Sequence, residues 1–430
     1  MPDPIRRLLN RAALGYWEPA ITQRTRDQVI ALLLKPDPKP YALEATVPYI
    51  DKATPDSTAD RYKLYEIEAE NYGKIQRYWV HRMVNTKYPL QEKMALFWHN
   101  HFATGFSKVK HAKLLARQYD IFYKYAFGKL GDMLRLISTD AAMLTWLDGM
   151  RNMKYAPNEN YARELFELFT LGVGHYTEKD VKETARALTG WQLDTTTGKV
   201  YFHRPYHDSG GKTIFGKSGK FALADVIRII LENPQTARFI TEKVLQTFVT
   251  PTPKKQDIER FAAIYRKSQY EMRTLLKAVL SDPLFDIEAK KRSLVRPPVD
   301  LLVASYRAGA VPMRPEFIYS YLFECGQTLF NPPSVAGWEG GHAWIASAPM
   351  IARYRLAKEI GQTAWNLTTK NRIYKGSDVI LFWAKRLCFV PSQTTLDTLL
   401  PYTNGGSAVK APNLQAMLTL LVFAPENQRY

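Results

Sequence analysis

Apolar residues recur at helical spacing along almost the whole chain, and this periodicity limits what the chain can fold into. Four clear patterns lie at residues 62–86, 89–103, 112–138 and 158–171. Helix-start signals precede several of them, such as the capping box that Thr25 opens. The alternation of apolar and polar residues that is typical of strands is scarce. Further helical patterns lie at 222–232, 235–249, 256–268, 270–281, 298–308, 314–329 and 343–362.

These patterns predict a mainly α protein, with one large multi-helix body spanning residues 1–430 and no repeat of fixed period. Three irregular segments interrupt it. Residues 36–58 carry five prolines and are expected to form an irregular connection. Residues 191–221 are polar and rich in Gly, Lys and His, which predicts a loop insertion with room for a short hairpin around 195–200. Residues 330–344 combine Pro, Gly and two Trp residues in a rigid loop.

The chain carries a net charge of +18, from 59 Lys and Arg against 41 Asp and Glu. This balance favours an acidic partner, such as an acidic polymer or glycan, an acidic protein or a membrane surface. A solvated basic surface with no specific partner is an equally ordinary explanation. The basic residues are scattered and form no stripe, so nucleic acid is not the expected partner.

Targeting and redox signals are few. Met1 is followed directly by an amphipathic helical pattern, so no signal peptide is expected, although an export signal upstream of this numbering stays open. No apolar run approaches the roughly 20 residues of a transmembrane helix, which predicts a soluble chain. Cys325 and Cys388 form no close pair; two buried thiols are expected, a disulfide stays open, and the compartment is left undecided.

The run Pro157–Gly172 packs charges and large apolar groups into one short helix. Glu159 and Arg163 stand four residues apart and can form an ion pair on one face. Glu164 lies nearer the apolar side, where a carboxylate needs a partner or has a raised pKa. The ordinary interpretation is a structural helix with surface ion pairs. The functional one makes Glu164 catalytic, Glu159 a metal ligand and Arg163 a substrate-binding residue.

Two histidines, His99 and His101, flank Asn100 at the end of the 89–103 helical pattern. On an ideal helix their rings diverge by about 200°, so one ion cannot reach both. Buried histidines with satisfied rings are therefore the default expectation. If Gly105 ends the helix early, the two rings are candidate ligands of a divalent metal ion.

The polar loop insertion holds a third candidate set, His207, Asp208 and Lys212. His207 and Asp208 are suited to acid–base catalysis or to metal binding, and Lys212 to holding an anionic substrate. The loop lacks the spacing of a phosphate-binding P-loop, so a nucleotide is not indicated. A flexible turn with incidental polar residues is the ordinary alternative.

The loop at 330–344 is the fourth candidate, with Asn331 and Trp338 as substrate-binding residues. Trp rings stack on sugar rings or cations, but a rigid packed connection between two helices is the simpler interpretation. The motifs of serine hydrolases, typical zinc proteases, Rossmann enzymes and C-x-x-C proteins do not occur in the chain.

Taken together, these segments resemble a widespread bacterial family catalogued as domain of unknown function 1800. The resemblance implies a mainly helical protein from a family in which many members look exported. It therefore suggests the periplasm or the cell exterior, with the cytoplasm as the alternative. Members are often encoded beside proteins similar to sulfatases and alkaline phosphatases. No settled reaction comes with the family. The matching pieces are Leu8–Ala12, Lys93–Phe102, Met143-Leu144, Leu147-Asp148, Asn158–Gly172, Asp180-Val181, Ala185–Trp191, His207-Asp208 with Lys212, and Asn331–Trp338.

Two functional hypotheses follow. The first is a metal-assisted enzyme, a hydrolase or transferase, acting on an acidic or ester-bearing glycan or another envelope polymer. It requires the segments 99–101, 158–167 and 207–212 to meet in one cleft. The alternative is a non-catalytic basic protein that binds an acidic polymer, or an acidic protein such as a sulfatase- or phosphatase-like neighbour, at the cell envelope.

Overall fold

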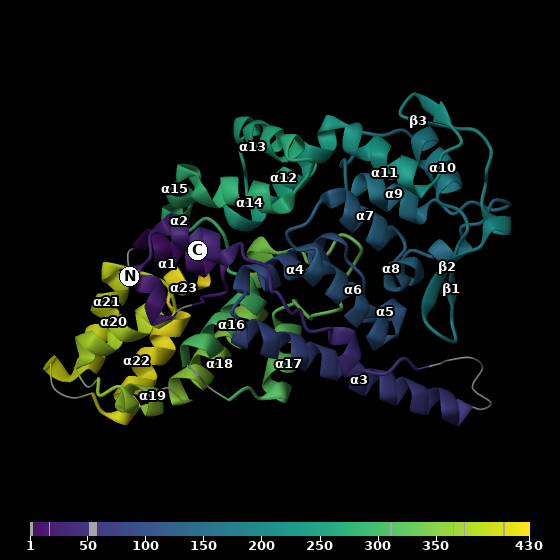
Figure 1. Ribbon diagram of the computed structural model, residues 1–430. Helices are drawn as coiled ribbons and strands as arrows, with labels where there is room; N and C mark the ends of the chain where they lie inside the picture. Colours follow the sequence, from purple (N-terminus) through teal and green to yellow (C-terminus); the bar gives the residue numbers. More distant parts are fainter. Residues whose placement is uncertain are drawn as a thin grey trace.

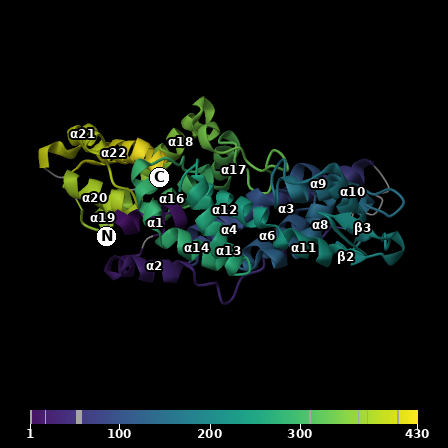
Figure 2. The ribbon, with the colours of Figure 1, turned by 90° about the horizontal axis from the view of Figure 1, so that it is seen from above.

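The computed structural model describes residues 3–16, 18–50, 58–309, 312–363, 365–373, 375–406 and 409–430. Within these residues it contains 23 α-helices, six short 3₁₀ segments and two small sheets, which confirms the prediction of a mainly α protein. The body is elongated, and the C-terminal helices lie at the opposite end from the two sheets (Figures 1 and 2).

The first half of the chain forms the centre of the body and most of one end. Helix α4 lies in the middle, packed against α6, α1 and α2. Its neighbour α3 is the longest helix, with 28 residues. The bounds are α1 (Asp3–Ala12), α2 (Arg26–Leu33), α3 (Thr58–Asn85), α4 (Pro89–His101), α5 (Phe106–Val109), α6 (Ala112–Lys124), α7 (Leu130–Ser138), α8 (Ala141–Trp146), α9 (Asn160–Glu167) and α10 (Glu178–Ala187).

The polar insertion at 191–221 contains two antiparallel hairpins, one more than the sequence predicts. Strands β1 (Trp191–Asp194) and β2 (Lys199–Phe202) pair in the register Trp191 to Phe202. Strands β3 (Lys212–Ile214) and β4 (Lys217–Gly219) form the second hairpin, and β3 packs on α10. Because α10 anchors β3, the insertion is held to the helical body.

The second half returns along the body and ends beside the first helix. Helix α11 packs on α7 and α10, α12 to α14 pack on one another, and α16 to α23 build the C-terminal part (Figure 1). The bounds are α11 (Leu223–Glu232), α12 (Pro234–Phe248), α13 (Lys255–Lys267), α14 (Met272–Ser281), α15 (Pro283–Lys291), α16 (Pro298–Gly309), α17 (Pro315–Glu324), α18 (Ser347–Thr363), α19 (Trp365–Lys370), α20 (Gly376–Arg386), α21 (Gln393–Leu399), α22 (Ala411–Phe423) and α23 (Pro425–Gln428).

Helix α4 is buried on every side, although its sequence suggests one apolar stripe. Twelve of its thirteen residues are buried, including Glu92 and Lys93. Glu92 accepts hydrogen bonds from Trp79 Nε1 at 3.1 Å, from Tyr119 and from Arg82. Buried charges are expensive unless they are paired and hydrogen-bonded, so these partners are a condition for burying α4.

The proline-rich connection is described in part. Residues 36–50 form a connection with one 3₁₀ segment, Leu43–Thr46, and residues 51–57 lie outside the described residues. Thr25 and Thr177 both form capping boxes at the starts of α2 and α10.

Within the described ranges, no helix is both long enough and apolar enough to cross a membrane.

Candidate functional site

The last turn of α4 uses its polar side chains to hold other segments of the fold. His99 Nε2 accepts a hydrogen bond from the Phe330 amide at 3.2 Å, and Asn100 Oδ1 accepts one from the Trp338 amide at 2.7 Å. His101 Nε2 donates to the Phe169 carbonyl at 3.0 Å. Three consecutive residues therefore fix two loops that follow them by about 70 and about 230 positions.

Burial keeps both imidazoles neutral. It lowers the pKa of His99 to about 3 and that of His101 to about 3. Both rings lie among aromatic side chains; the His99 ring is edge-on to Trp338, with centroids 5.3 Å apart. The bonds also fix opposite tautomers, because His99 accepts at Nε2 whereas His101 donates there.

The loop at 330–344 is bonded back to the segment that follows α4. The Phe330 carbonyl accepts from the Phe106 amide at 2.9 Å, and Asn331 Oδ1 accepts from the Ser107 amide at 2.9 Å. Trp338 is buried, so its ring offers no open face to a sugar. Asn331 and Trp338, expected to bind substrate, thus lie in a rigid connection within the body.

Gly337 is required where this loop crosses α4. Its φ is +85°, and a Cβ there would lie 2.3 Å from Asn100 Oδ1 and 2.4 Å from the Asn100 carbonyl oxygen. Neither the backbone conformation nor the space suits a side chain.

The charged side chains of α9 differ in whether they have partners. Arg163 pairs with Glu159 at 3.2 Å and with Glu178, the first residue of α10, at 2.6 Å, on the partly exposed surface. Glu164 is half-buried, and burial together with the neighbouring Glu167 raises its pKa. Within the described chain the Glu164 carboxyl group makes no hydrogen bond or ion pair, although the Glu164 carbonyl accepts from the Leu168 and Phe169 amides.

The loop around His207 is fastened to the end of α10. His207 Nδ1 donates to the Thr189 carbonyl at 3.0 Å, and Asp208 accepts from Arg186 Nε at 2.7 Å. Burial disfavours the charged form of Asp208, but the Arg186 bond and the Gly210 amide outweigh it and lower its pKa. The Lys212 ammonium is fully enclosed and donates to the carbonyls of Asp208 and Gly210. His207 and Asp208 therefore fasten the loop to the end of α10, and Lys212 bonds the loop to itself.

The three segments expected to share a cleft are neighbours but do not meet at one point. Arg163 pairs with Glu178 at the start of α10, whereas Asp208 pairs with Arg186 eight positions later, about 12 Å along the helix. Among the residues that the structure describes, no three His, Cys, Asp or Glu side chains are grouped so as to hold a metal ion. His99, His101 and Glu159 are thus not assembled into one ligand set.

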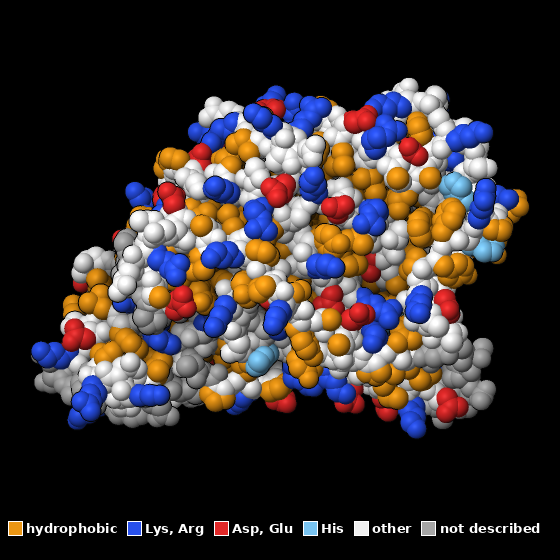
Figure 3. Space-filling view, viewed as in Figure 1, with side chains coloured by type: hydrophobic (Ala, Val, Ile, Leu, Met, Phe, Trp, Pro, Cys, Tyr) orange, Lys and Arg blue, Asp and Glu red, His pale blue; other side chains and the backbone are white. Residues whose placement is uncertain are grey.

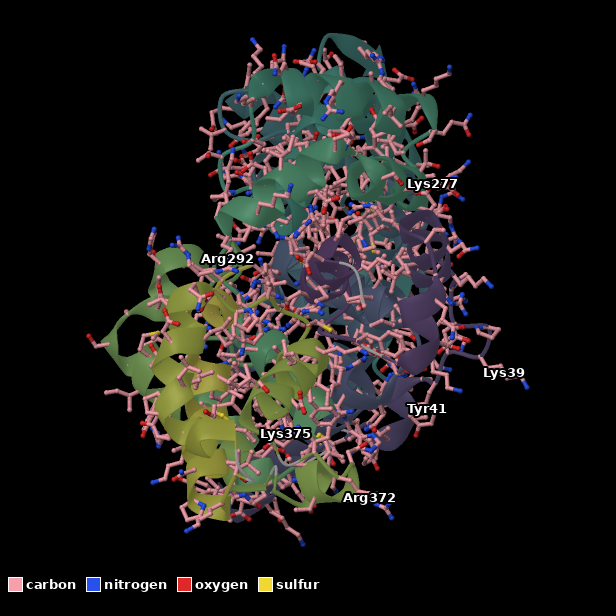
Figure 4. All side chains as sticks on the ribbon, turned by 90° about the vertical axis from the view of Figure 1, so that its left-hand side faces the viewer. Lys39, Tyr41, Lys277, Arg292, Arg372 and Lys375 are labelled. Carbon is pink, nitrogen blue, oxygen red and sulfur yellow. The ribbon has the colours of Figure 1, made fainter. Side chains whose placement is uncertain are left out.

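The structure brings together a basic pocket at the other end of the body, where α1, the end of α15 and the C-terminal residues meet. Its volume is about 180 Å³. Figure 4 shows Arg292 in this region, between the α12–α15 part and the C-terminal helices. The pocket also contains two carboxylates, Asp3 and Glu426. Its six cations, called the anion pocket below, are Arg6, Arg7, Arg11, Lys290, Arg292 and Arg429.

These cations differ in how far the fold already uses them. Arg11 is buried and donates to the carbonyls of Phe248, Val249, Glu288 and Tyr430. Arg292 donates to the Val390 carbonyl at 2.8 Å and lies 3.7 Å from Glu426. Within the described chain Lys290 and Arg429 have no ion-pair partner. Two buried polar atoms on the lining, Arg11 Nε and Asn10 Oδ1, also have no partner there.

Comparison with known proteins identifies the family. A sequence model described as "Protein of unknown function (DUF1800)" matches residues 7–429. The chain belongs to the DUF1800 family. Neither the curated proteins nor the solved structures yield a match to it.

In this DUF1800 protein, the segments that carry the resemblance are largely bonded to one another. The end of α4 holds the Asn331–Trp338 loop, and the end of α10 holds the His207–Lys212 loop. The anion pocket was missed by sequence analysis because its cations come from segments more than 270 positions apart. The available signal was Asn10-Arg11, two polar residues that directly follow the apolar pair Leu8-Leu9 in α1.

Replacing Gly337 with Ala should destabilise the protein by about 2–4 kcal/mol, because the new Cβ collides with Asn100 and the positive φ is strained. Urea denaturation measures the change. Gly341→Ala is the matched control: its φ is +55°, but no atom lies within 4 Å of the added Cβ. It should cost only about 1 kcal/mol. Equal losses in the two variants would contradict the close crossing.

Replacing His99 with Gln should make the protein less sensitive to acid. The pKa of His99 is lowered in the folded state, so the unfolded chain takes up the proton first as pH falls below about 6.5. Stability contributed by the neutral ring is complete above that pH and is lost as pH falls towards 3. Gln keeps an acceptor for the Phe330 amide without this titration.

Urea denaturation between pH 6 and pH 4 gives the test. The slope of the unfolding free energy against pH should fall by about 1.4 kcal/mol per pH unit in the variant. His81→Gln, at an exposed position, should leave the slope unchanged. An unaltered slope in His99→Gln would show that His99 is not held neutral by burial.

Proposed function

We propose that this DUF1800 protein binds an acidic ligand through the anion pocket, without itself catalysing a reaction. The observation that carries the proposal is the pocket's charge: six cations face two carboxylates. Lys290 and Arg429 make no ion pair with an acidic side chain of the described chain, and Arg11 is bonded to main-chain oxygens alone. Guanidinium groups are suited to phosphate, sulfate and carboxylate groups, because their donors match two oxygens at once.

The size of the pocket indicates how much of the ligand it takes. About 180 Å³ accommodates a single anionic group, so the remainder of a larger ligand extends beyond it. Lys and Arg side chains are spread over the surface in Figure 3 without forming one continuous stripe. Positive charge that is spread over the surface attracts an acidic ligand from a distance. In the proposal, the direct contacts with the ligand are made in the pocket.

The remaining polar candidates support binding over catalysis. His99, His101 and Asp208 are each hydrogen-bonded to a neighbouring segment, and Lys212 is bonded to two carbonyls of its own loop. A catalytic group has to reach a substrate, and His99, His101 and Lys212 are buried.

Isothermal titration with inorganic phosphate and sulfate at low ionic strength tests the proposal. We expect one saturable site, and Lys290→Gln combined with Arg429→Gln should weaken it at least tenfold, because both unpaired cations are lost. The matched control removes two exposed lysines elsewhere, Lys39→Gln with Lys277→Gln (Figure 4). These two lysines lie away from the pocket, and salt screens their charges, so the control variant should change the affinity for phosphate by less than about twofold. Absence of saturable binding, or equal weakening in both double variants, contradicts the proposal.

A metal-assisted hydrolase or transferase acting on an ester-bearing glycan is the second candidate. One observation favours it: Glu164 has a raised pKa and no partner in the described chain, as a general acid or base requires. Elemental analysis of the purified protein separates the two proposals. A stoichiometric divalent metal that Glu164→Gln loses would favour the enzyme. Metal-free protein that retains phosphate binding would favour the binding protein.

A further inference from the structure

A second, larger depression adjoins the anion pocket. Its volume is about 600 Å³, and it lies between α21, α22 and the end of α15. It shares Arg292, Glu426 and Arg429 with the anion pocket, so the two depressions adjoin at these residues. A volume of this size suits a small organic ligand, whereas one phosphate or sulfate group would leave most of it empty.

The walls of this depression are mainly apolar, and we call it the apolar groove. It is defined by Leu399, Leu420, Phe423, Ala424 and Pro425, with the side chains of Thr394 and Thr398 along one edge. Leu399 is fully buried, and Leu420 and Phe423 are half-buried. Thr398 donates its hydroxyl to the Thr394 carbonyl at 2.8 Å, so this hydroxyl already has an acceptor within its own helix.

Charge is confined to one end of the groove. Lys291, Arg292 and Arg429 stand there against a single lining carboxylate, Glu426. Burial disfavours the charged form of Glu426, but bonds from Ser392 and Thr395 outweigh it and lower its pKa. Ser392 N donates at 2.6 Å and Thr395 Oγ1 at 2.9 Å, so Glu426 already has its donors. The end of the groove therefore remains a cationic site.

We propose that the ligand of this site is a single-chain amphiphile, with a phosphate or sulfate monoester in the anion pocket and its hydrocarbon chain along the apolar groove. This inference rests on the proposed anion binding and names the class of ligand. Cations at one end and apolar walls along the rest complement such a molecule in both charge and polarity. The apolar side chains lie inside a depression, so they contact a molecule that enters it and not a flat membrane surface.

Titration of the full-length protein with three probes tests the inference: inorganic phosphate, octyl phosphate and octyl glucoside, each below its micelle-forming concentration. Octyl phosphate should bind at least tenfold more tightly than inorganic phosphate, because its octyl chain is transferred from water into the apolar groove. Octyl glucoside has the same chain without the charge and should bind at least tenfold more weakly than octyl phosphate.

A variant in the apolar groove distinguishes the contribution of the ligand's hydrocarbon chain to the affinity from that of its phosphate group. Thr398→Trp fills the groove from an exposed position, so the fold should be retained. It should abolish the advantage of octyl phosphate while leaving the affinity for inorganic phosphate unchanged. Thr196→Trp, in the exposed turn between β1 and β2 at the far end of the body, is the matched control and should keep both affinities.

The outcomes distinguish failure of this inference from failure of the proposed function. If inorganic phosphate does not bind, the anion pocket fails and the inference fails with it. If phosphate binds but octyl phosphate gains nothing, only the amphiphile is overturned. Equal binding of octyl glucoside, or adsorption to phosphatidylglycerol vesicles that octyl phosphate does not compete for, would also overturn it.

Discussion

The structure depends on one constraint: helix α4 carries polar side chains into the interior, and each must find its partner in another segment. A buried polar group without a partner costs about 1–3 kcal/mol, and a buried charge costs more. The partners of α4 lie before it in the chain, immediately after it, and up to the last residue. The helix therefore fixes the positions of segments that are far apart in sequence. The side chains concerned are Gln91, Glu92, Lys93, His99, Asn100 and His101.

This constraint changes how the most recognisable motifs of the family are interpreted. Imidazoles, amides and carboxylates close to glycines and tryptophans are typical of active sites. In this protein they are bonded at the ends of helices and in rigid loops: Asn100 accepts from the Trp338 amide, and Asp208 accepts from the Arg186 side chain. Residues able to catalyse are also residues able to satisfy buried amides and carbonyls. The fold uses them in the second way, and Glu164 is the exception with no such bond in the described chain.

The cations of the anion pocket fall into two groups: some are bonded within the fold, and others have no ion-pair partner in the described chain. Arg11 supplies donors to four carbonyls from three segments, and so it holds α1 against α15 and the chain end. Close to it, Lys290 and Arg429 have no counter-charge in the described chain. In the proposed function, cations that the fold already holds rigid lose little side-chain entropy when an anion binds. The apolar groove adjoins that pocket at Arg292, Glu426 and Arg429.

The sequence by itself determined the helices, because helix formation depends on spacing and on end signals within a few residues. The pattern at 89–103 became α4 (Pro89–His101), and Thr25 caps the helix expected of it. It also located the irregular insertion at 191–221, although the second hairpin has too few residues to show alternation. Only the tertiary structure decided which polar side chains are enclosed and which cations meet. The partner of His99 lies 231 positions away, and the anion pocket joins both ends of the chain. Local periodicity carries no information about contacts of that range.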